Sequence, residues 1–361
     1  MSITQTQIAA KLGVSQPAVA FALSDTPQAL RQLSTETREL IIQTAQQMGY
    51  VPHRAAQRLS RARSDNRAAS FDQAGFIYLG GAEQDIDSIC LTMMQGVENE
   101  LSKLHASLTF VRVCEPGDWK KVERLMRGSG VDGWLLVGRV NDEVVDRLNS
   151  APLNGIPYVI LGDHRCTRPV HSVNVDHHAV GRLAVEHLAS LGHRRIAILK
   201  GGTDFVYQRQ ILEGFRAARK ELGLEDEERL AAHASIWMDP RNGGMKITDS
   251  AIGWLKQNGL LPTAMFIPEP GSAIDFDPVL KQWEVEVPRS MSVVGCGFTP
   301  SRAAGQNSTF VEWPIAEVGH QGALLLHRIA AEQNAASVEL KIPPSLVKGW
   351  STGPCNMEPA K

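Results

Sequence analysis

The sequence predicts a small all-α head followed by a larger α/β core made of two parallel-sheet subdomains. In the first 50 residues, apolar positions recur at helical spacing and are interrupted by glycine and by capping serines. From about residue 74 onward, short β-branched or aliphatic runs alternate with helical patterns, the order that builds parallel sheets covered by helices. With 361 residues, 43% of them hydrophobic, the chain is long enough for two or three cores.

Three helices are predicted in the head. The inward positions of the first two are Ile8, Ala9, Leu12, Val19, Ala22 and Leu23. Gly13 permits the tight turn between these helices, and Ser15 can cap the second. Ser34 opens a third helix, whose expected apolar face is Leu40, Ile41, Ala45 and Met48. The second helix is left with an outer face of Gln16, Pro17, Ala20 and Phe21.

The core alternates strands with helices after a polar linker over residues 60–73. The predicted strands are 76–79, 108–113, 134–137, 158–161, 173–175, 196–199, 233–237, 264–267 and 292–295. The predicted helices are 88–104, 117–128, 140–149, 177–191, 208–222 and 244–257. Because right-handed crossovers join such strands in parallel, this many strands fit two sheets better than one.

Charge is distributed unevenly along the chain. The whole chain carries 37 Lys and Arg against 39 Asp and Glu, but residues 1–64 carry seven against three. The head is therefore at +4 and the remainder at −6, which favours contact with phosphates at one end only. The five cysteines are scattered without a CxxC pair, so we expect reduced thiols, no metal and no cofactor. No run of 18 apolar residues occurs, and we expect a cytoplasmic protein.

The head and the core together resemble the lac and gal repressor family. The head runs on into the segment Tyr50-Val-Pro-His-Arg-Ala-Ala-Gln-Arg-Leu59. Core segments that resemble the family are 176–181, 184–188, 191–198, 213–215, 292–295 and 349–353. The resemblance implies a sequence-specific DNA-binding regulator, a repressor by preference, acting as a homodimer on a palindromic operator. It also implies a core similar to periplasmic sugar-binding proteins, in which three strands of chain cross between two subdomains.

On this resemblance the chain divides into a helix-turn-helix domain over 1–50, a hinge helix and linker over 51–73, and an effector and dimerisation domain over 74–361. The N-subdomain is expected to take about 74–170 and 301–330. The C-subdomain is expected to take about 171–300 and 331–361.

The expected DNA contacts are Thr4, Ser15, Gln16, Pro17, Ala20, Phe21, Gln32, His53, Arg54, Arg58 and Leu59. Gln16 can donate and accept hydrogen bonds at an adenine edge, whereas Pro17 and Phe21 offer apolar contact to thymine methyl groups. Many relatives carry an arginine near the position of Phe21. The alternative is that Phe21 folds back into the head's core. By the resemblance, Leu59 is a wedge inserted into the minor groove.

The expected effector site departs from the family at three positions. Ile211 stands where sugar-binding members have arginine, Glu269-Pro270 where they have Asn-Asp, and Gly297 where they have an acidic residue. A plain sugar is therefore not expected, and an anionic or modified sugar is favoured. The candidate effector residues are Asp163, His164, Tyr207, Arg209, Glu269 and Trp313. The alternative is that Trp313 packs a hinge between the subdomains and that Arg209 makes a surface ion pair.

Other classes of site are weaker. His177 and His178 are adjacent and so point apart on a helix, which argues against a metal pair. The sequence lacks GxSxG, HExxH and P-loop motifs, so we do not expect an enzyme. Two alternatives stay open: a DNA-binding regulator that no longer responds to a ligand, and an enzyme on a Rossmann-like fold.

Overall fold

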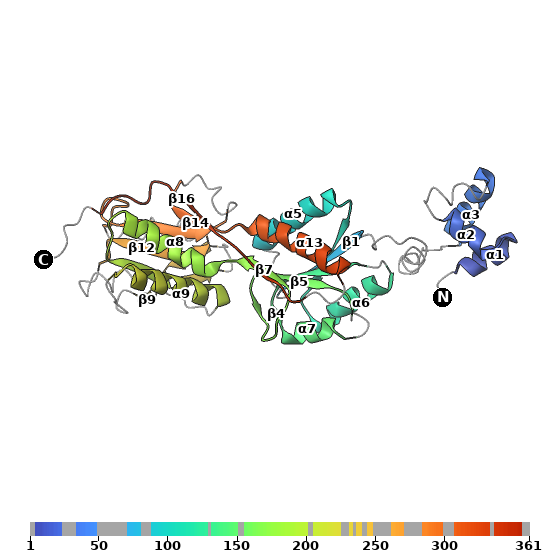
Figure 1. The fold of residues 1–361 in the computed structure, drawn as a ribbon, viewed down its shortest axis with the longest axis horizontal. Helices are drawn as coiled ribbons and strands as arrows, with labels where there is room; N and C mark the ends of the chain where they lie inside the picture. The colour runs from blue at the N-terminus through green and yellow to red at the C-terminus, as the bar shows by residue number, and fades with distance from the viewer. Residues whose placement is uncertain are drawn as a thin grey trace. The chain divides into compact units, whose positions relative to one another are not determined.

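The computed structural model describes residues 4–23, 34–48, 71–80, 88–128, 131–150, 155–200, 205–224, 231–233, 236–239, 244–247, 261–270, 284–298, 307–332 and 336–355 (Figure 1). The chain forms two compact units, one of residues 1–70 and 124–130 and one of residues 71–123 and 131–361. Five of the expected DNA contacts lie outside the described residues: Gln32, His53, Arg54, Arg58 and Leu59. The expected hinge helix lies outside them as well.

Three helices of the first unit share one small core. They are α1 (Gln5–Leu12), α2 (Gln16–Ala22) and α3 (Thr35–Gln47). Their buried side chains are Ile8, Ala9, Val19, Ala22, Ile41 and Ala45. The expectation for α3 was wrong at Leu40, which is 54% exposed, because the buried stripe of this helix runs through Ile41, Thr44 and Ala45 at positions i, i+3 and i+4.

The second unit begins with a sheet of six parallel strands. Its order is β15 (Glu339–Ile342), β7 (Ser172–Val175), β5 (Tyr158–Leu161), β3 (Gly133–Gly138), β1 (Gln73–Leu79) and β2 (Ser107–Val113). The helices α5 (Ser88–Lys103) and α13 (Ile315–Ala331) lie on one face, and α6 (Trp119–Gly128) and α7 (Asp142–Leu148) on the other (Figure 1). The strand interiors are apolar, as expected of a sheet that is covered on both sides.

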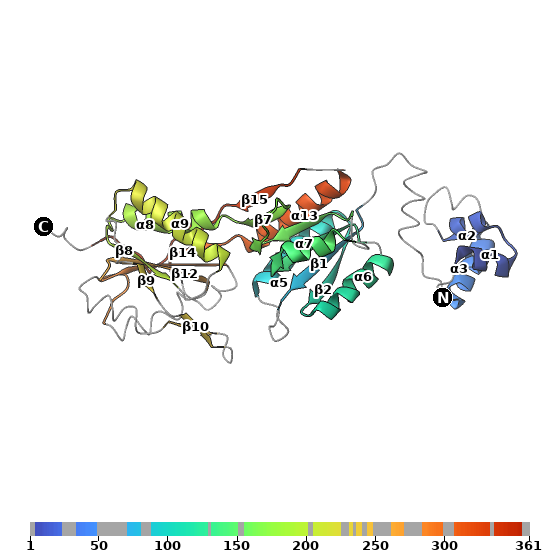
Figure 2. The same ribbon diagram turned by 90° about the horizontal axis from the view of Figure 1, so that it is seen from below.

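A second six-stranded sheet follows. Its order is β16 (Ser345–Val347), β14 (Phe310–Glu312), β13 (Ser292–Gly297), β12 (Ala264–Pro270), β8 (Ile196–Lys200) and β9 (Ala231–His233), and only the β14–β16 pair in it is antiparallel. The helices α8 (His177–Ser190) and α9 (Val206–Glu221) lie side by side on one face of this sheet (Figure 2). One continuous apolar cluster extends through both halves of the unit.

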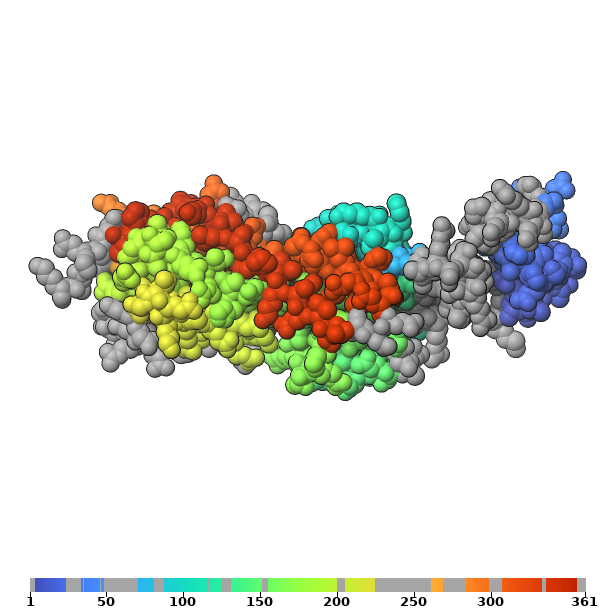
Figure 3. All heavy atoms as spheres, in the orientation of Figure 1, coloured from blue at the N-terminus to red at the C-terminus, as the bar shows by residue number. Residues whose placement is uncertain are grey.

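The described chain crosses three times between the sheets, as the family resemblance implied. The crossings connect β7 to α8, β14 to α13 and β15 to β16. The expected subdomain boundaries need correction at the strand level, because β7 and β15 pair into the first sheet and β14 pairs into the second. Residues near the C-terminus consequently lie on both halves of the unit (Figure 3).

One predicted helix was wrong. Residues 244–247, the start of the helix expected over 244–257, form β11 (Gly244–Ile247), which pairs antiparallel with β10 (Ile236–Asp239). Glycine at the first position lowers helix propensity, and a nearby strand offers a local partner for the backbone. The remainder of that predicted helix lies outside the described residues.

Several core segments that resemble the family have structural roles. His193 is buried and bridges β13 to the C-terminal segment, with Nε2 2.9 Å from Ser292 Oγ and 3.1 Å from the carbonyl oxygen of Gly353. Ser351 Oγ donates to the carbonyl of Val293 at 2.7 Å and accepts the N–H of Thr309 at 2.8 Å. These bonds satisfy buried polar groups along the second sheet.

Candidate functional site

Helix α2 has an outer face of polar and apolar residues, and contacts at its start and along its inner face hold the helix in place. Ser15 caps the helix by accepting the N–H of Ala18 at 3.3 Å, and Val19 and Ala22 hold its inner face in the core. The helix before it is fixed by a reciprocal cap, in which Thr4 and Gln7 each bond the other's backbone N–H.

The described residues expected to contact DNA are all exposed: Thr4, Ser15, Gln16, Pro17, Ala20 and Phe21. Phe21 is 37% exposed and lies outside the head's buried core, unlike the alternative in which it folds inward. An exposed phenylalanine on a short helix offers an apolar contact surface.

A second cluster forms where the two sheets of the larger unit meet, around Asp163. This residue follows β5 in the first sheet. One carboxylate oxygen accepts the side-chain amide of Asn174 at 2.7 Å, and the other accepts the backbone N–H of Tyr207, at the start of α9, at 2.9 Å. Asp163 therefore bonds both halves of the unit.

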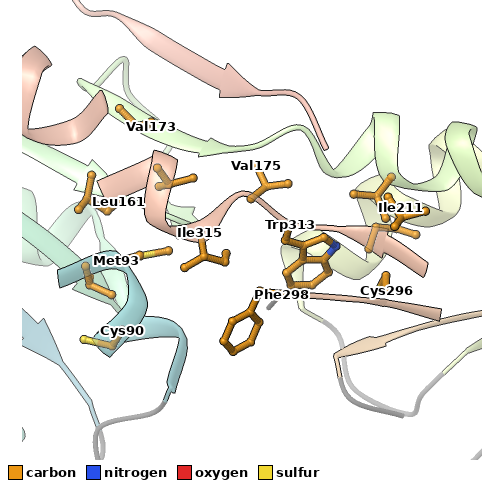
Figure 4. Packing of buried hydrophobic residues seen from close by; sticks show 14 of the residues in the cluster. Cys90, Met93, Leu161, Val173, Val175, Ile211, Cys296, Phe298, Trp313 and Ile315 are labelled. Carbon is orange, nitrogen blue, oxygen red and sulfur yellow. The ribbon is translucent and has the colours of Figure 1, made fainter. Parts of the chain in front are cut away.

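Four aromatic side chains continue this cluster. The ring of His177 lies edge-on to Trp313, with centroids 4.9 Å apart, and 5.6 Å from the ring of Tyr207. Tyr207 also contacts Trp313 at 5.5 Å and stacks on Phe205, whose side chain is half exposed. Figure 4 shows Trp313 among apolar side chains that include Val175, Ile315 and Phe298.

His177 is held neutral in this cluster. It is almost fully buried, and burial lowers its pKa to about 4 against the opposing pull of Asp163 and Asp176. Its Nε2 lies 3.7 Å from a carboxylate oxygen of Asp163. The other ring nitrogen, Nδ1, and the indole nitrogen of Trp313 are buried without a hydrogen-bond partner among the described residues. Such orphaned polar atoms are unusual and mark a place where a ligand or water can bond.

The six expected effector residues do not all meet. Asp163, Tyr207 and Trp313 belong to the cluster. The Nδ1 atom of His164 instead accepts the N–H of Cys166 at 3.3 Å within its own turn. Arg209 is exposed on the first turns of α9, and the side chain of Glu269 lies outside the described part.

Three members of this cluster were not predicted from the sequence: Asn174, His177 and Phe205. Nothing in their local pattern marks them, because their meeting depends on how β5, β7 and the starts of α8 and α9 converge. Of the three departures from the family, Ile211 is fully buried in α9 and so serves the packing of the second half.

Other site types receive no support from the described residues. They contain no group of three histidine, cysteine, aspartate or glutamate side chains able to hold a metal ion. All five cysteines lie in the described ranges, and none of them forms a disulfide. No helix in the same ranges is long and apolar enough to cross a membrane.

Two family models match this chain in overlapping ranges. One describes periplasmic binding proteins and the sugar-binding domain of the LacI family and matches residues 73–239. The other describes a periplasmic binding protein-like domain and matches residues 185–352. The chain belongs to the lac/gal repressor family of transcriptional regulators. Its membership accounts for the two sheets and the three crossings between them.

Curated members of this family match nearly the whole chain and are regulators rather than enzymes. The HTH-type transcriptional regulator CelR of Thermobifida fusca is 26% identical and covers 91% of this chain and 92% of its own length. DegA of Bacillus subtilis, also an HTH-type transcriptional regulator, is 24% identical and covers 99% of this chain and 100% of its own length.

Solved structures of the family share the fold. A CelR–cellobiose complex superposes with a TM-score of 0.61 at 23% identity, covering 97% of this chain and 99% of that one. A lac repressor dimer bound to operator and the anti-inducer ONPF gives a TM-score of 0.67 at 20% identity, covering 98% of this chain and 100% of that one.

Proposed function

We propose that this regulator is a repressor that binds a palindromic operator as a homodimer through a helix-turn-helix head, and that a small effector modulates it. A two-fold symmetric protein matches two inverted half-sites one helical turn apart. In a solved structure of a relative, the lac repressor is bound to its operator as a dimer.

The observation that carries the DNA-binding proposal is the outer face of α2. The helix is capped at its start, anchored by two buried residues, and exposes Gln16, Pro17, Ala20 and Phe21. A short helix anchored in this way can enter the major groove, with its N-terminal residues at the base edges. Gln16 then favours adenine, and Pro17 with Phe21 favours thymine methyl groups.

The cluster around Asp163 supports a role for an effector. It combines a carboxylate, exposed aromatic surface and two buried nitrogens that have no partner in the described part of the chain. Phe205 and the partly exposed Tyr207 give a ligand aromatic surface, and Arg209 gives an anion a positive charge on the same helix. An anionic or modified sugar suits these groups better than a neutral one, because the polar side chain of most relatives is replaced by Ile211.

A regulator without any effector is the second candidate. One observation favours it: both carboxylate oxygens of Asp163 are already bonded within the protein. An operator affinity that no compound of a small-molecule screen changes would support this candidate.

The test of the DNA-binding proposal is selection of bound sequences from a randomised DNA pool. The wild type should enrich an inverted repeat. Phe21→Arg should shift one position of each half-site toward guanine, because arginine bridges guanine O6 and N7.

Leu40→Arg is the matched control, since it adds the same charge at an exposed residue of α3 and should leave the selected sequence unchanged. An unchanged preference in Phe21→Arg would remove Phe21 from the DNA-reading surface. The absence of any enriched sequence in the wild type would overturn the proposal.

A further inference from the structure

Helix α9 is not capped by the side chain of its own N-cap residue. Its N-cap residue, Phe205, offers no side-chain hydrogen bond, whereas α8 is capped by Asp176 immediately before it and α2 by Ser15. The first N–H groups of a helix need acceptors, and the helix dipole favours a negative charge there. At α9 that acceptor is the carboxylate of Asp163, 44 residues away in sequence and in the other half of the unit.

Asp163 is held in position for this contact by Asn174 and His177. The side-chain oxygen of Asn174 accepts the N–H of Val175 at 2.8 Å, which orients the amide so that its nitrogen donates to Asp163. The Nε2 atom of His177 lies 3.7 Å from the carboxylate oxygen that accepts the Asn174 amide. Asp163 is therefore oriented by β7 and α8 while its second oxygen bonds α9.

We propose that Asp163 is an internal latch that takes the place of an anionic effector. Its carboxylate joins the start of α9 to the first sheet, and an effector carboxylate or phosphate regulates the protein by displacing it. This inference rests on the proposed effector role of the cluster and specifies the ligand class and the mode of regulation.

Two buried nitrogens beside the latch, which have no hydrogen-bond partner among the described residues, support a ligand at this position. The indole nitrogen of Trp313 can only donate a hydrogen bond, so its missing partner is an acceptor. Nδ1 of His177 lacks a partner as well, and the rings of both residues contact Tyr207, whose N–H the latch occupies. An anion seated at the start of α9 brings acceptor oxygens to the N–H groups of the first turn and to the indole N–H of Trp313.

Hydrogen exchange of the full-length protein, measured by mass spectrometry on the peptide that spans the start of α9, tests the latch. In Asp163→Ala the amide of Tyr207 loses its acceptor, and exchange there should accelerate at least about tenfold. Sodium formate should slow the exchange at Tyr207 again in Asp163→Ala, because formate supplies the missing carboxylate. Sodium chloride at the same concentration should leave the exchange fast. Phosphate in place of formate distinguishes the two kinds of effector anion.

Asp142→Ala is the control, since its carboxylate bonds Thr167 within the first half and its loss should leave α9 unchanged. If Asp163→Ala does not fold, Asp163→Asn serves instead. Hydrogen exchange at the start of α9 should then accelerate less, because the amide oxygen still accepts the N–H although the negative charge is gone. Unchanged exchange at α9 in the folded variant overturns the latch, and acceleration that neither anion reverses overturns its role as a stand-in for a ligand. These measurements need no DNA, so loss of operator binding alone contradicts the proposed function and not the latch.

Discussion

Gly181 of α8 and Gly214 of α9 lie against each other's helix backbone. A methyl group on Gly181 would collide with the carbonyl oxygen of Ile211, and one on Gly214 with the carbonyl oxygen of His178. The same arrangement recurs in the first half, where Gly96 of α5 meets the carbonyl of Ala316 and Gly319 of α13 meets that of Met93. Each half is thus covered by two helices in close contact, and α9 is fixed well enough to receive the carboxylate of Asp163.

Gly214→Ala should lower the free energy of unfolding by roughly 1–3 kcal/mol, because the added methyl group forces the two helix backbones apart. Urea unfolding followed by circular dichroism measures the change. Gly117→Ala is the matched control, since nothing lies within 4 Å of a methyl group at that position. Equal stability of both variants would contradict the close helix contact.

Acid should destabilise the larger unit through His177. Burial lowers the pKa of this residue from 6.5 to about 4 in the folded protein, so the unfolded chain binds more protons between these values. The free energy of unfolding should therefore fall as the pH drops from about 6.5 to about 4, by up to about 3 kcal/mol from this residue. Burial lowers the pKa of His187 and His193 as well, so they add losses of the same sign.

Urea unfolding at pH 7 and pH 5 in the wild type, His177→Asn and His178→Asn isolates the contribution of His177. The acid-induced loss should shrink in His177→Asn and persist in His178→Asn, which replaces a less buried neighbour. The same loss in all three proteins would assign the effect to other groups.

Much of the architecture could be predicted from periodicity. The alternation of apolar runs and helical patterns identified the parallel sheets, since strands such as 133–138 and helices such as 206–221 carry strong local signals. The C-terminal strands β15 and β16 have only four and three residues, which is too short for a clear pattern. Their assignment to different sheets depends on long-range pairing and not on local sequence.

The cluster around Asp163 was only half predictable. The family resemblance named Asp163, Tyr207 and Trp313 as ligand-binding residues, but not that they bond and pack against one another. The desolvation of His177 and the cap at α9 arise from contacts between residues 14 to 136 positions apart, so no local pattern encodes them. The exposure of Leu40 was not predicted for a simpler reason. Neighbouring residues of a helix point in different directions, so the buried stripe can include Ile41 and leave Leu40 outside it.

Leu59→Ala should weaken specific operator binding and DNA bending while leaving the stability of the larger unit unchanged. The leucine is flanked by Arg54, Arg58, Arg61 and Arg63, a setting that suits an apolar wedge between phosphate contacts. Gel-shift titration and a bending assay measure both effects. Leu222→Ala, at an exposed leucine of the larger unit, serves as control. Unchanged affinity and bending in Leu59→Ala would exclude the wedge.

Neutral sugars should bind in the millimolar range or not at all. The polar side chains that sugar-binding members are expected to use are missing at Ile211, Pro270 and Gly297, so a neutral sugar leaves hydroxyl groups unpaired, at roughly 1–3 kcal/mol for each buried group. Anionic sugars should bind more tightly and lose affinity in Arg209→Ala, but not in Arg216→Ala, which removes an exposed arginine further along α9. Calorimetry decides this, and micromolar binding of an unmodified hexose that persists in Arg209→Ala would contradict the expectation.

Footprinting of the purified protein across the genome of its source tests the central claim most directly. We predict protected sites that contain an inverted repeat, with half-site centres about one helical turn or roughly 10 base pairs apart. Protection should fall steeply with salt concentration, because lysine and arginine side chains release counterions from the phosphates. Protection without a shared sequence, or a single asymmetric site bound by one copy of the chain, would contradict a dimeric operator-binding repressor.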